Sequence, residues 1–202
     1  MLDLPHYPST KNNRDLILSI IKLYLPNKGN IIETASGTGE HIVYFAEKFP
    51  LLSWYPTDKN SNMFWAIKKR SLQLKNVSSP KVLDLCENVN SSQKKYFNAL
   101  LNINMIHISP WEACIGLFSL ANKILNNEGF VYLYGPYKKN NLHTSQSNEE
   151  FDQKLRIKNP SWGVRSIEEV TCVSKKYGFF LYKSHEMPSN NYSHIFYKSK
   201  NS

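Results

Sequence analysis

The sequence predicts an α/β protein with a doubly wound, mostly parallel sheet that carries helices on both faces. Segments with the apolar spacing of helices alternate with short β-rich runs along most of the 202 residues. About seven strands are expected, and only a short, turn-rich stretch separates the last two, 179–184 and 192–199. That separation indicates an antiparallel pair at the end of the sheet. In such sheets ligands bind beyond the carboxyl ends of the strands.

The chain begins with the order helix, strand, helix. Apolar residues recur at helical spacing over 13–25, and Pro26 ends that helix. The β-rich run 30–34 is the first expected strand. A second helix is expected at 40–49, where the apolar spacing is again helical and Pro50 follows.

The middle of the chain continues the alternation with a strand at 51–55, a helix at 62–74 and a short strand at 81–84. The run 97–106 (FNALLNINMI) is too apolar for a surface helix. It is typical of a buried parallel strand, which is covered on both faces.

The last third opens with a helix at 111–125 after Pro110. A strand over 130–135 (FVYLYG) then ends at Gly135 and Pro136. The polar stretch 138–147 has no periodicity and is expected to be a loop. Two further helices precede the final strands; they are expected at 148–156 and at 166–177, the second ending before Gly178.

Length and composition favour one folded domain over 1–202, without a separate substrate domain. The apolar share of 41% and the aromatic share of 13% argue against disorder. The sequence has no apolar run of the roughly 20 residues that span a bilayer, and MLDLPHYPST lacks the order of a secretory signal. We therefore expect a cytoplasmic protein that has no membrane partner.

Cys86, Cys114 and Cys172 are odd in number and form no CxxC pair, and no His neighbours them at metal-ligand spacing. They are expected to be reduced, mostly buried thiols, and no metal site is predicted.

The formal charge of +9 raises the possibility of a nucleic-acid partner. The lysines, however, are scattered as short pairs such as Lys68-Lys69 and Lys175-Lys176, without an Arg-rich or aromatic stripe. Solvated faces are the favoured interpretation, and nucleic acid stays possible but less favoured.

The stretch IIETASGTGEH at 31–41 predicts a strand that turns sharply into a helix. The small residues of 35–39 let a ligand approach the backbone, and the following helix offers its N-terminal amides. The dinucleotide pattern GxGxxG is not met, and no GK[ST] follows for a phosphate loop. Glu33, just before the turn, would repel a pyrophosphate but can bind a cation or an ammonium group.

Acids also follow the next two strands. Asp58 stands 19 residues after Gly39, where nucleotide folds place an acid on the ribose hydroxyls. Asp84 and Leu85 follow the third strand and can meet an adenine edge. Acids at three strand ends without a phosphate-binding Lys suit an adenosine with a positively charged amino-acid tail, which is S-adenosylmethionine (SAM).

This order of motifs resembles that of class I SAM-dependent methyltransferases, whose first motif is usually acid-x-G-x-G-x-G, although Ala35 replaces the first glycine. Over nearly its whole length the chain is similar to the methyltransferase-like branch catalogued as domain of unknown function 938. The early Arg-Asn pair of that branch reads Asn12-Asn13 here, so only Asn13 carries over. The matching blocks are ASGTGEH at 35–41, WYPTD at 54–58, INMIHISPW at 103–111, YGPY at 134–137, QSNEEFDQKLRIKNPSWGVR at 146–165 and MPSNN at 187–191.

The resemblance implies a Rossmann-like class I methyltransferase fold that uses SAM. It assigns the methionine part of SAM to four residues of the glycine turn: Glu33, Ser36, Gly37 and Gly39. It gives the ribose to Asp58 and the adenine to Asp84 with Leu85. Asn104, at the carboxyl end of the fourth strand, is a candidate contact for the cofactor or the substrate.

His107 is the candidate catalytic residue, because an imidazole near its ordinary pKa of about 6.5 can take a proton from an attacking atom. The alternative is a structural, hydrogen-bonded His107 that fixes the turn at Ser109. Arg165 either binds an anionic group or braces its loop, and Asn190 and Asn191 either enter a pocket or make a tight turn. The candidate substrate residues are Asn13, Trp111, Tyr137, Arg165, Asn190 and Asn191.

The sequence thus predicts a SAM-dependent methyltransferase that acts on a small molecule. Two alternatives stay open, a non-catalytic SAM-binding regulatory module and a nucleic-acid methyltransferase. The absence of an N-P-P-[YF] run disfavours the second, since Asn104-Met105-Ile106-His107 stands at that place. The methyl acceptor, the oligomeric state and the physiological role stay open.

Overall fold

The computed structural model describes residues 4–87 and 96–199, which share one sheet of nine strands. Seven strands follow one another in the order β3-β2-β1-β4-β5-β9-β8. The first five are parallel, and β9 runs antiparallel to both β5 and β8. This arrangement confirms the predicted sheet. The seven strands are β1 Gly29–Thr34, β2 Leu52–Asp58, β3 Lys81–Val82, β4 Phe97–Ile103, β5 Leu125–Lys139, β8 Phe179–Met187 and β9 Asn191–Lys198.

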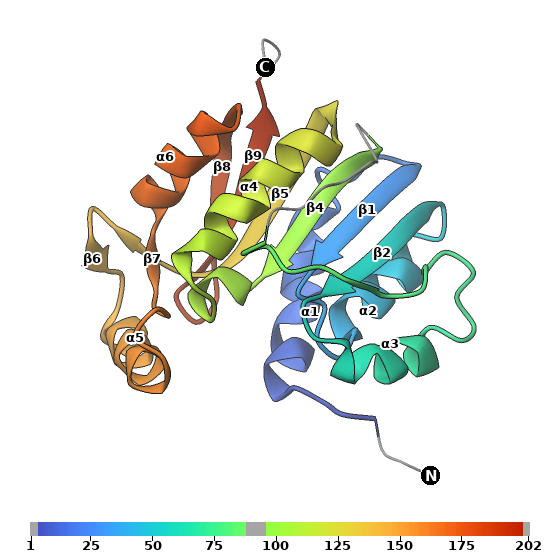
Figure 1. Cartoon of the computed structure of the whole chain (residues 1–202), viewed down its shortest axis with the longest axis horizontal. Coiled ribbons are helices and arrows are strands. Elements are labelled where there is room, and N and C mark those ends of the chain that lie inside the picture. Colours follow the sequence, from blue (N-terminus) through green and yellow to red (C-terminus); the bar gives the residue numbers. More distant parts are fainter. Residues whose placement is uncertain (1–3, 88–95, 200–202) are drawn as a thin grey trace.

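Helices cover both faces of the sheet (Figure 1). On the face nearer the viewer lie α4 (Trp111–Ile124) and α6 (Ile167–Lys176). On the other face α1 (Pro8–Ile21) and α2 (Glu40–Lys48) pack together. A short 3₁₀ turn η1 (Ser61–Met63) leads into α3 (Phe64–Arg70), which packs against α2.

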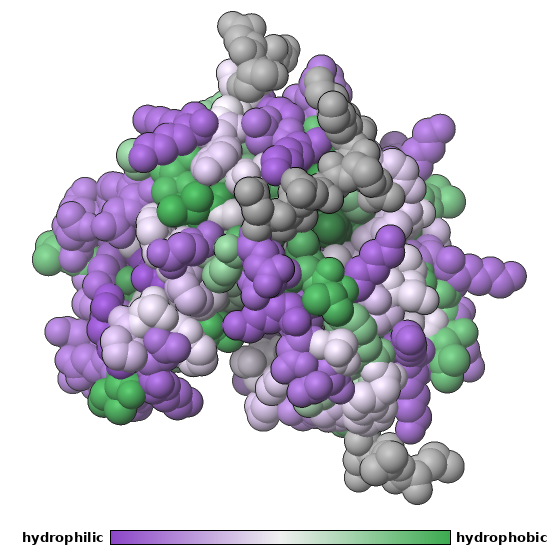
Figure 2. Space-filling view, in the orientation of Figure 1, coloured by the Kyte–Doolittle hydropathy of each residue, from purple (hydrophilic) through white to green (hydrophobic). Residues whose placement is uncertain are grey.

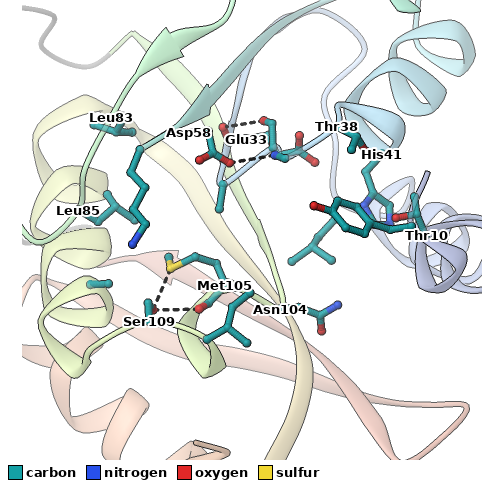
Figure 3. Close-up of a pocket in the computed structure, with 18 of the residues that line it drawn as sticks. Thr10, Glu33, Thr38, His41, Asp58, Leu83, Leu85, Asn104, Met105 and Ser109 are labelled. Carbon is teal, nitrogen blue, oxygen red and sulfur yellow. Dashed lines mark hydrogen bonds between the residues drawn. The ribbon is translucent and has the colours of Figure 1, made fainter. Parts of the chain in front are cut away.

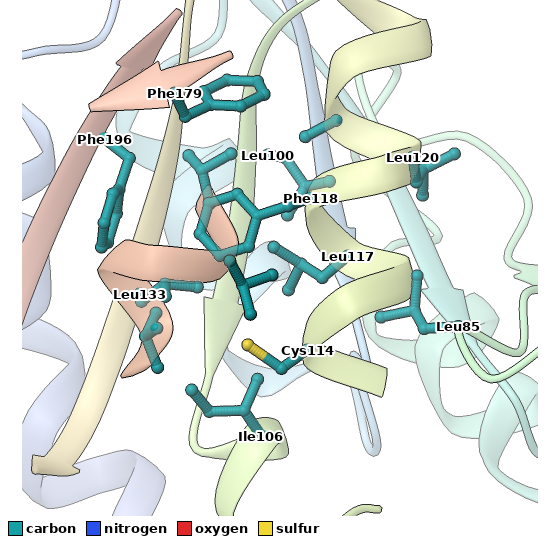
Figure 4. Packing of buried hydrophobic residues seen from close by; sticks show 14 of the residues in the cluster. Leu85, Leu100, Ile106, Cys114, Leu117, Phe118, Leu120, Leu133, Phe179 and Phe196 are labelled. Carbon is teal, nitrogen blue, oxygen red and sulfur yellow. The ribbon is translucent and has the colours of Figure 1, made fainter. Parts of the chain in front are cut away.

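Each face of the sheet has its own apolar core. On β4 the side chains alternate: Leu100 joins Leu117 and Phe118 of α4, whereas Ala99 and Leu101 join the cluster under α1 and α2. Figure 4 shows the first core, packed between α4 and the strands. A parallel strand covered on both faces accounts for the unbroken apolar run read from the sequence.

The predicted end of the fifth strand and the predicted loop after it were wrong. β5 passes through Gly135 and Pro136 to Lys139, and the chain returns in β6 (Leu142–His143), which pairs with the end of β5. Asn140 and Asn141 connect the two with φ of 51° and 60°. Asparagine tolerates this left-handed backbone, so an Asn-Asn pair closes a two-residue hairpin that a search for apolar alternation does not detect.

Several other boundaries moved, and the following three have a clear local cause. The strand expected at 97–106 ends at Ile103, because Asn104 adopts a left-handed φ of 62° and the 3₁₀ turn η2 (Met105–His107) follows. The first helix begins at Pro8, which suits a first helical position because it has no backbone N–H to leave unpaired. The helix expected at 148–156 is α5 (Gln146–Lys158), capped by Ser145, and β7 (Arg165–Ser166) then pairs with β5.

The cysteines only partly fit their prediction. All three are free thiols, but Cys86 and Cys172 are exposed and only Cys114 is buried. Cys172 lies on α6 between the buried Val170 and Val173, at a position that the helical spacing turns outward. The description of the thiols as mostly buried was therefore wrong.

Hydrophilic side chains cover much of the molecular face seen in Figure 2. Within residues 4–87 and 96–199, no helix combines the length and the apolar character needed to cross a membrane.

Candidate active site

A cavity of about 440 Å³ opens at the carboxyl ends of β1, β2 and β4, within the range of about 300–1,000 Å³ usual for ligand pockets. Its wall comes from the glycine turn after β1, the segments after β2 and β3, the turn after β4 and the start of α1. Figure 3 shows these side chains around the opening. Seven of the eight predicted cofactor residues lie in this wall: Glu33, Ser36, Gly37, Asp58, Asp84, Leu85 and Asn104.

The glycine turn is folded back onto the end of β2. Ala35, Gly37 and Gly39 all take left-handed φ values, 56°, 52° and 78°. The backbone N–H of Gly37 donates to Asp58 Oδ2 over 2.9 Å. Gly39 does not line the cavity, and a Cβ on it would stand 2.9 Å from Ile67 Cγ1 of α3. Gly39 therefore allows α2 and α3 to pack closely rather than forming cavity surface.

Glu33, at the end of β1, is a buried carboxyl group on the cavity wall. It is 3% exposed, and its Oε2 has no hydrogen-bond partner within the described residues. Burial raises the pKa of Glu33 to about 8; Ser36 opposes this rise and the neighbouring Asp58 adds to it. A buried carboxylate needs a compensating partner, so this group fits a ligand that brings a positive charge.

The two other strand-end acids have backbone partners as well as room for a ligand. Asp58 Oδ1 accepts the backbone N–H of Asn60 over 2.9 Å, and Asp84 Oδ1 accepts that of Cys86 over 2.8 Å. A carboxylate offers about four lone-pair directions, so both side chains can still accept hydroxyl or amino protons. These backbone bonds fix the carboxylates in place before a ligand arrives.

Leu85 supplies apolar surface beside Asp84. It is buried, and its carbonyl oxygen lies only 1.7 Å from the place that a Cβ on Gly116 would occupy. Because Gly116 has no side chain, the segment after β3 can lie directly on α4. A glycine in the middle of a helix thus determines where this part of the cavity wall stands.

The segment before α1 covers one side of the cavity, which the sequence reading did not anticipate. The backbone N–H of Tyr7 donates to Glu40 Oε2 over 3.0 Å, and His6 pairs with the other oxygen of Glu40 at 2.7 Å. Arg70 donates to the carbonyls of Pro5 and Thr38 over 2.5 and 3.2 Å. Tyr7 itself lines the cavity. The sequence signal for this arrangement is Pro8, which is typical of the first position of a helix.

His107 does not line the cavity. Its side chain is 1% exposed, and neither ring nitrogen has a partner within the described residues. The ring packs edge-on against the buried Tyr137, with centroids 4.9 Å apart. Burial lowers the pKa of His107 to about 3, and Arg165 adds to the fall. This packing favours a structural role for His107 over a catalytic one. The structural alternative predicted a hydrogen-bonded ring, however, and within the described residues the ring makes no hydrogen bond.

Arg165 braces the turn after β4. Its guanidinium donates to the carbonyls of Ile106 over 3.0 Å and of Ser109 and Ser161 over 2.7 Å. It also lies over the Trp111 ring, 5.5 Å from the centroid. These contacts favour the bracing alternative over the binding of an anionic group.

Asn190 and Asn191 lie away from the cavity, at the turn between β8 and β9, and Asn190 ties that turn to α5. Asn190 has a φ of 57°, as the tight-turn alternative requires. Its carbonyl accepts from Asn148 Nδ2 over 2.9 Å, and its amide donates to Ser147 Oγ over 3.3 Å. The amide of Asn191 donates to the turn carbonyls of Pro188 and Ser189. Asn190 thus joins the turn to α5, whereas the Asn191 side chain stabilises the turn itself.

Asn13 and His41 meet at the edge of the cavity. His41, the second residue of α2, lines it, and its Nε2 is 2.8 Å from Asn13 Oδ1. Asn13 was predicted from resemblance, whereas His41 was missed although it ends the GTGEH motif. The glycines of that motif predict a ligand turn, but nothing in the spacing alone shows that the second helical residue turns into the cavity.

A family model described as "Protein of unknown function (DUF938)" matches residues 5–198. The chain belongs to this family. Among solved structures, this DUF938 chain is similar to an O-methyltransferase family protein from Burkholderia thailandensis (TM-score 0.80, 13% identity, 96% of this chain and 57% of that one). It is also similar to human N-acetylserotonin methyltransferase in complex with SAM (TM-score 0.77, 9% identity, 95% and 53%).

The DUF938 chain thus spans just over half the length of these two proteins. A proposed sarcosine dimethylglycine methyltransferase from Galdieria sulphuraria is matched over more of its length (TM-score 0.75, 12% identity, 95% of this chain and 87% of that one). At such low sequence identities the similarity establishes the methyltransferase fold. The reaction has to be inferred from the residues that line the cavity.

Proposed function

We propose that this protein binds SAM in the cavity and transfers its methyl group to a small-molecule acceptor. The observation that carries the proposal is the convergence of Glu33, Asp58 and Asp84, from three consecutive strand ends, on one cavity. Glu33 adds a buried carboxyl oxygen that has no partner within the described residues. A cationic adenosine derivative satisfies all three groups at once.

The residues present fit each part of SAM. Glu33 would hold the ammonium group, the Asp58 carboxylate would accept from the ribose hydroxyls, and Asp84 with Leu85 would receive the adenine. The bound cofactor supplies a methyl group on a sulfonium centre. The protein's own task is to align the acceptor with that methyl group and to exclude competing water.

A small molecule is the favoured acceptor because the start of α1 and Tyr7 cover one side of the cavity and narrow the access to it. The names of the similar structures, which include O-methyltransferases and N-acetylserotonin methyltransferase, support the same class. The net charge of +9 suggests nucleic acid as an alternative acceptor, which is less favoured. Salt-sensitive binding of an RNA or DNA duplex would favour it.

Isothermal titration calorimetry with SAM and S-adenosylhomocysteine tests the cofactor assignment. In the Gly37→Arg variant the long side chain would enter the cavity, and we expect binding to be lost. Gly178→Arg is the matched control, because Gly178 shares the left-handed backbone (φ 79°) but follows α6, outside the cavity wall. The proposal fails if the wild-type protein binds neither compound while binding another nucleotide.

Turnover needs a separate measurement. Wild-type protein with methyl-labelled SAM and a cell extract of metabolites should transfer label to the small-molecule fraction. Binding without any labelled product from metabolites, RNA or protein would instead identify a non-catalytic SAM-binding module.

A further inference from the structure

His41 lines the cavity but has no role in binding the cofactor as proposed. Its side chain points from α2 toward Thr10 of α1, which also lines the cavity (Figure 3). Its Nε2 lies 2.8 Å from the carbonyl oxygen of the Asn13 side chain. The ring thus touches α1 on one side and the cavity on the other.

The contact with Asn13 determines which nitrogen of His41 carries the hydrogen. An amide oxygen only accepts, so Nε2 must donate to it. A neutral imidazole has a single N–H, and Nδ1 is therefore left with a lone pair. Within the described residues no hydrogen bond is made to Nδ1, and His41 lines the cavity, so a ligand there can donate a proton to this lone pair.

The Tyr134 hydroxyl bears on the other end of the Asn13 amide. Burial raises the pKa of the Tyr134 hydroxyl on β5, and a side-chain hydrogen bond with Asn13 partly offsets the rise. Such an offset is what donation from the amide NH₂ to the phenol oxygen produces. The amide oxygen lies against His41, and this donation to Tyr134 is consistent with that placement of the oxygen. Three side chains, from β5, α1 and α2, thus contact one another in a row, which we call the relay.

The imidazole of His41 stays neutral at ordinary pH. Burial lowers its pKa to about 4, Arg14 on α1 adds to the fall, and Glu40 on α2 opposes it. Tyr134, from β5, stays protonated because its own pKa is raised. A lone pair on Nδ1 is therefore present throughout the physiological range.

We propose that His41 is the general base of the methyl transfer and that Asn13 is the residue that positions it. This inference rests on the proposed function and adds the acceptor class, a hydroxyl or amine that still carries a proton. The acceptor oxygen or nitrogen forms a bond to the methyl carbon, while the carbon–sulfur bond breaks and leaves its electron pair on sulfur. The acceptor proton passes to Nδ1 of His41 and then to water, and S-adenosylhomocysteine is released.

The decisive variant is His41→Gln. A glutamine amide reaches the position of Nε2 and can donate to Asn13, but it places no acceptor where Nδ1 stood. We expect S-adenosylhomocysteine to bind within about twofold of wild type by calorimetry. Transfer from methyl-labelled SAM to the small-molecule extract should fall by about 10²-fold, the low end of the usual contribution of a general base, because a pKa near 4 makes His41 a weak base. His185→Gln, whose histidine bonds Tyr24 outside the cavity, is the matched control.

The pH dependence separates a base from a packing residue. Wild-type transfer should stay level above about pH 5, because His41 is already neutral there. Transfer by His41→Gln should rise with pH, since hydroxide must then remove the acceptor proton. Asn13→Ala should lower transfer about tenfold without changing affinity for S-adenosylhomocysteine.

Nitrogen-15 NMR of the complex with S-adenosylhomocysteine tests the relay without any acceptor. The ring of His41 should show a protonated Nε2 and an unprotonated Nδ1 at pH 7, and Asn13→Ala should mix the two tautomers. A protonated Nδ1 overturns the proposal, as does wild-type transfer by His41→Gln. Equal losses of binding and transfer also overturn it, because His41 would then contact the cofactor. If wild-type protein does not bind SAM at all, the proposed function fails instead.

Discussion

Glu33 shows how a single buried group links stability to ligand binding. Its folded pKa of about 8 lies far above the ordinary value of 4.5, so between these two pH values the folded protein holds a proton that the unfolded chain has lost. The stability associated with this proton is complete below about pH 4.5 and is lost as the pH rises toward 8. A cation beside Oε2 would reverse this, because it favours the ionised carboxylate.

Replacing Glu33 with Gln should therefore raise stability and weaken binding. We expect Glu33→Gln to exceed wild type in unfolding free energy by on the order of 3 kcal/mol at pH 8 and to match it at pH 4.5. Its affinity for S-adenosylhomocysteine should fall about 10–100-fold, because a charge-assisted hydrogen bond is lost. Denaturant unfolding and calorimetry at the two pH values measure both effects.

Proton release gives a second readout of the same group. Wild-type binding at pH 7 should expel a proton, so its observed enthalpy should vary with the ionisation enthalpy of the buffer, and Glu33→Gln should show no such variation. Glu47→Gln, an exposed substitution on α2, is the control. Equal buffer dependence in both variants would contradict the assignment of Glu33.

Among elements, the strands at the sheet centre were the most predictable. The run 97–106 was recognised because a strand buried on both faces must be apolar on both. The hairpin at Asn140 and Asn141 was missed because it depends on backbone conformation rather than on hydrophobicity. The strand-end acids were found by their spacing, whereas His41 depends on how α2 turns beside α1. The sequence therefore predicts which elements form more readily than which side chains meet between them.

Substitution of Gly116 tests whether the close packing of α4 against the segment after β3 determines the position of the cavity wall. In a helix, Gly→Ala alone stabilises by about 0.5–1 kcal/mol. Here the added Cβ would stand 1.7 Å from the Leu85 carbonyl oxygen, so the segment must move. We expect Gly116→Ala to lose about 1–3 kcal/mol of stability and to weaken S-adenosylhomocysteine binding about tenfold. Ser119→Ala, on the same helix, should leave both unchanged; a stabilised, fully binding Gly116→Ala would contradict this account.

At the scale of the whole molecule, one side of the cavity is covered by contacts between parts of the chain that lie far apart in sequence. Arg70 on α3 holds the carbonyl of Pro5, 65 residues earlier, and Glu40 on α2 holds the backbone of Tyr7. The glycine turn is bound to the same group, since Arg70 also holds Thr38. Because none of these contacts is periodic, they left no pattern in the sequence. The cavity thus depends on tertiary contacts more than the sheet does.

Loosening the segment before α1 should change how long a ligand stays. In Arg70→Gln the donors to Pro5 and Thr38 are shortened or lost, while the acids at the strand ends are untouched. We expect the dissociation rate of S-adenosylhomocysteine to rise about 3–10-fold with little change in association rate, because affinity differences among variants of one site arise mostly in dissociation. Stopped-flow fluorescence with displacement by excess SAM measures the rate. Lys68→Gln removes the same charge from an exposed position on α3. Equal dissociation rates in the two variants would show that the contacts of Arg70 do not hold the segment before α1 over the cavity.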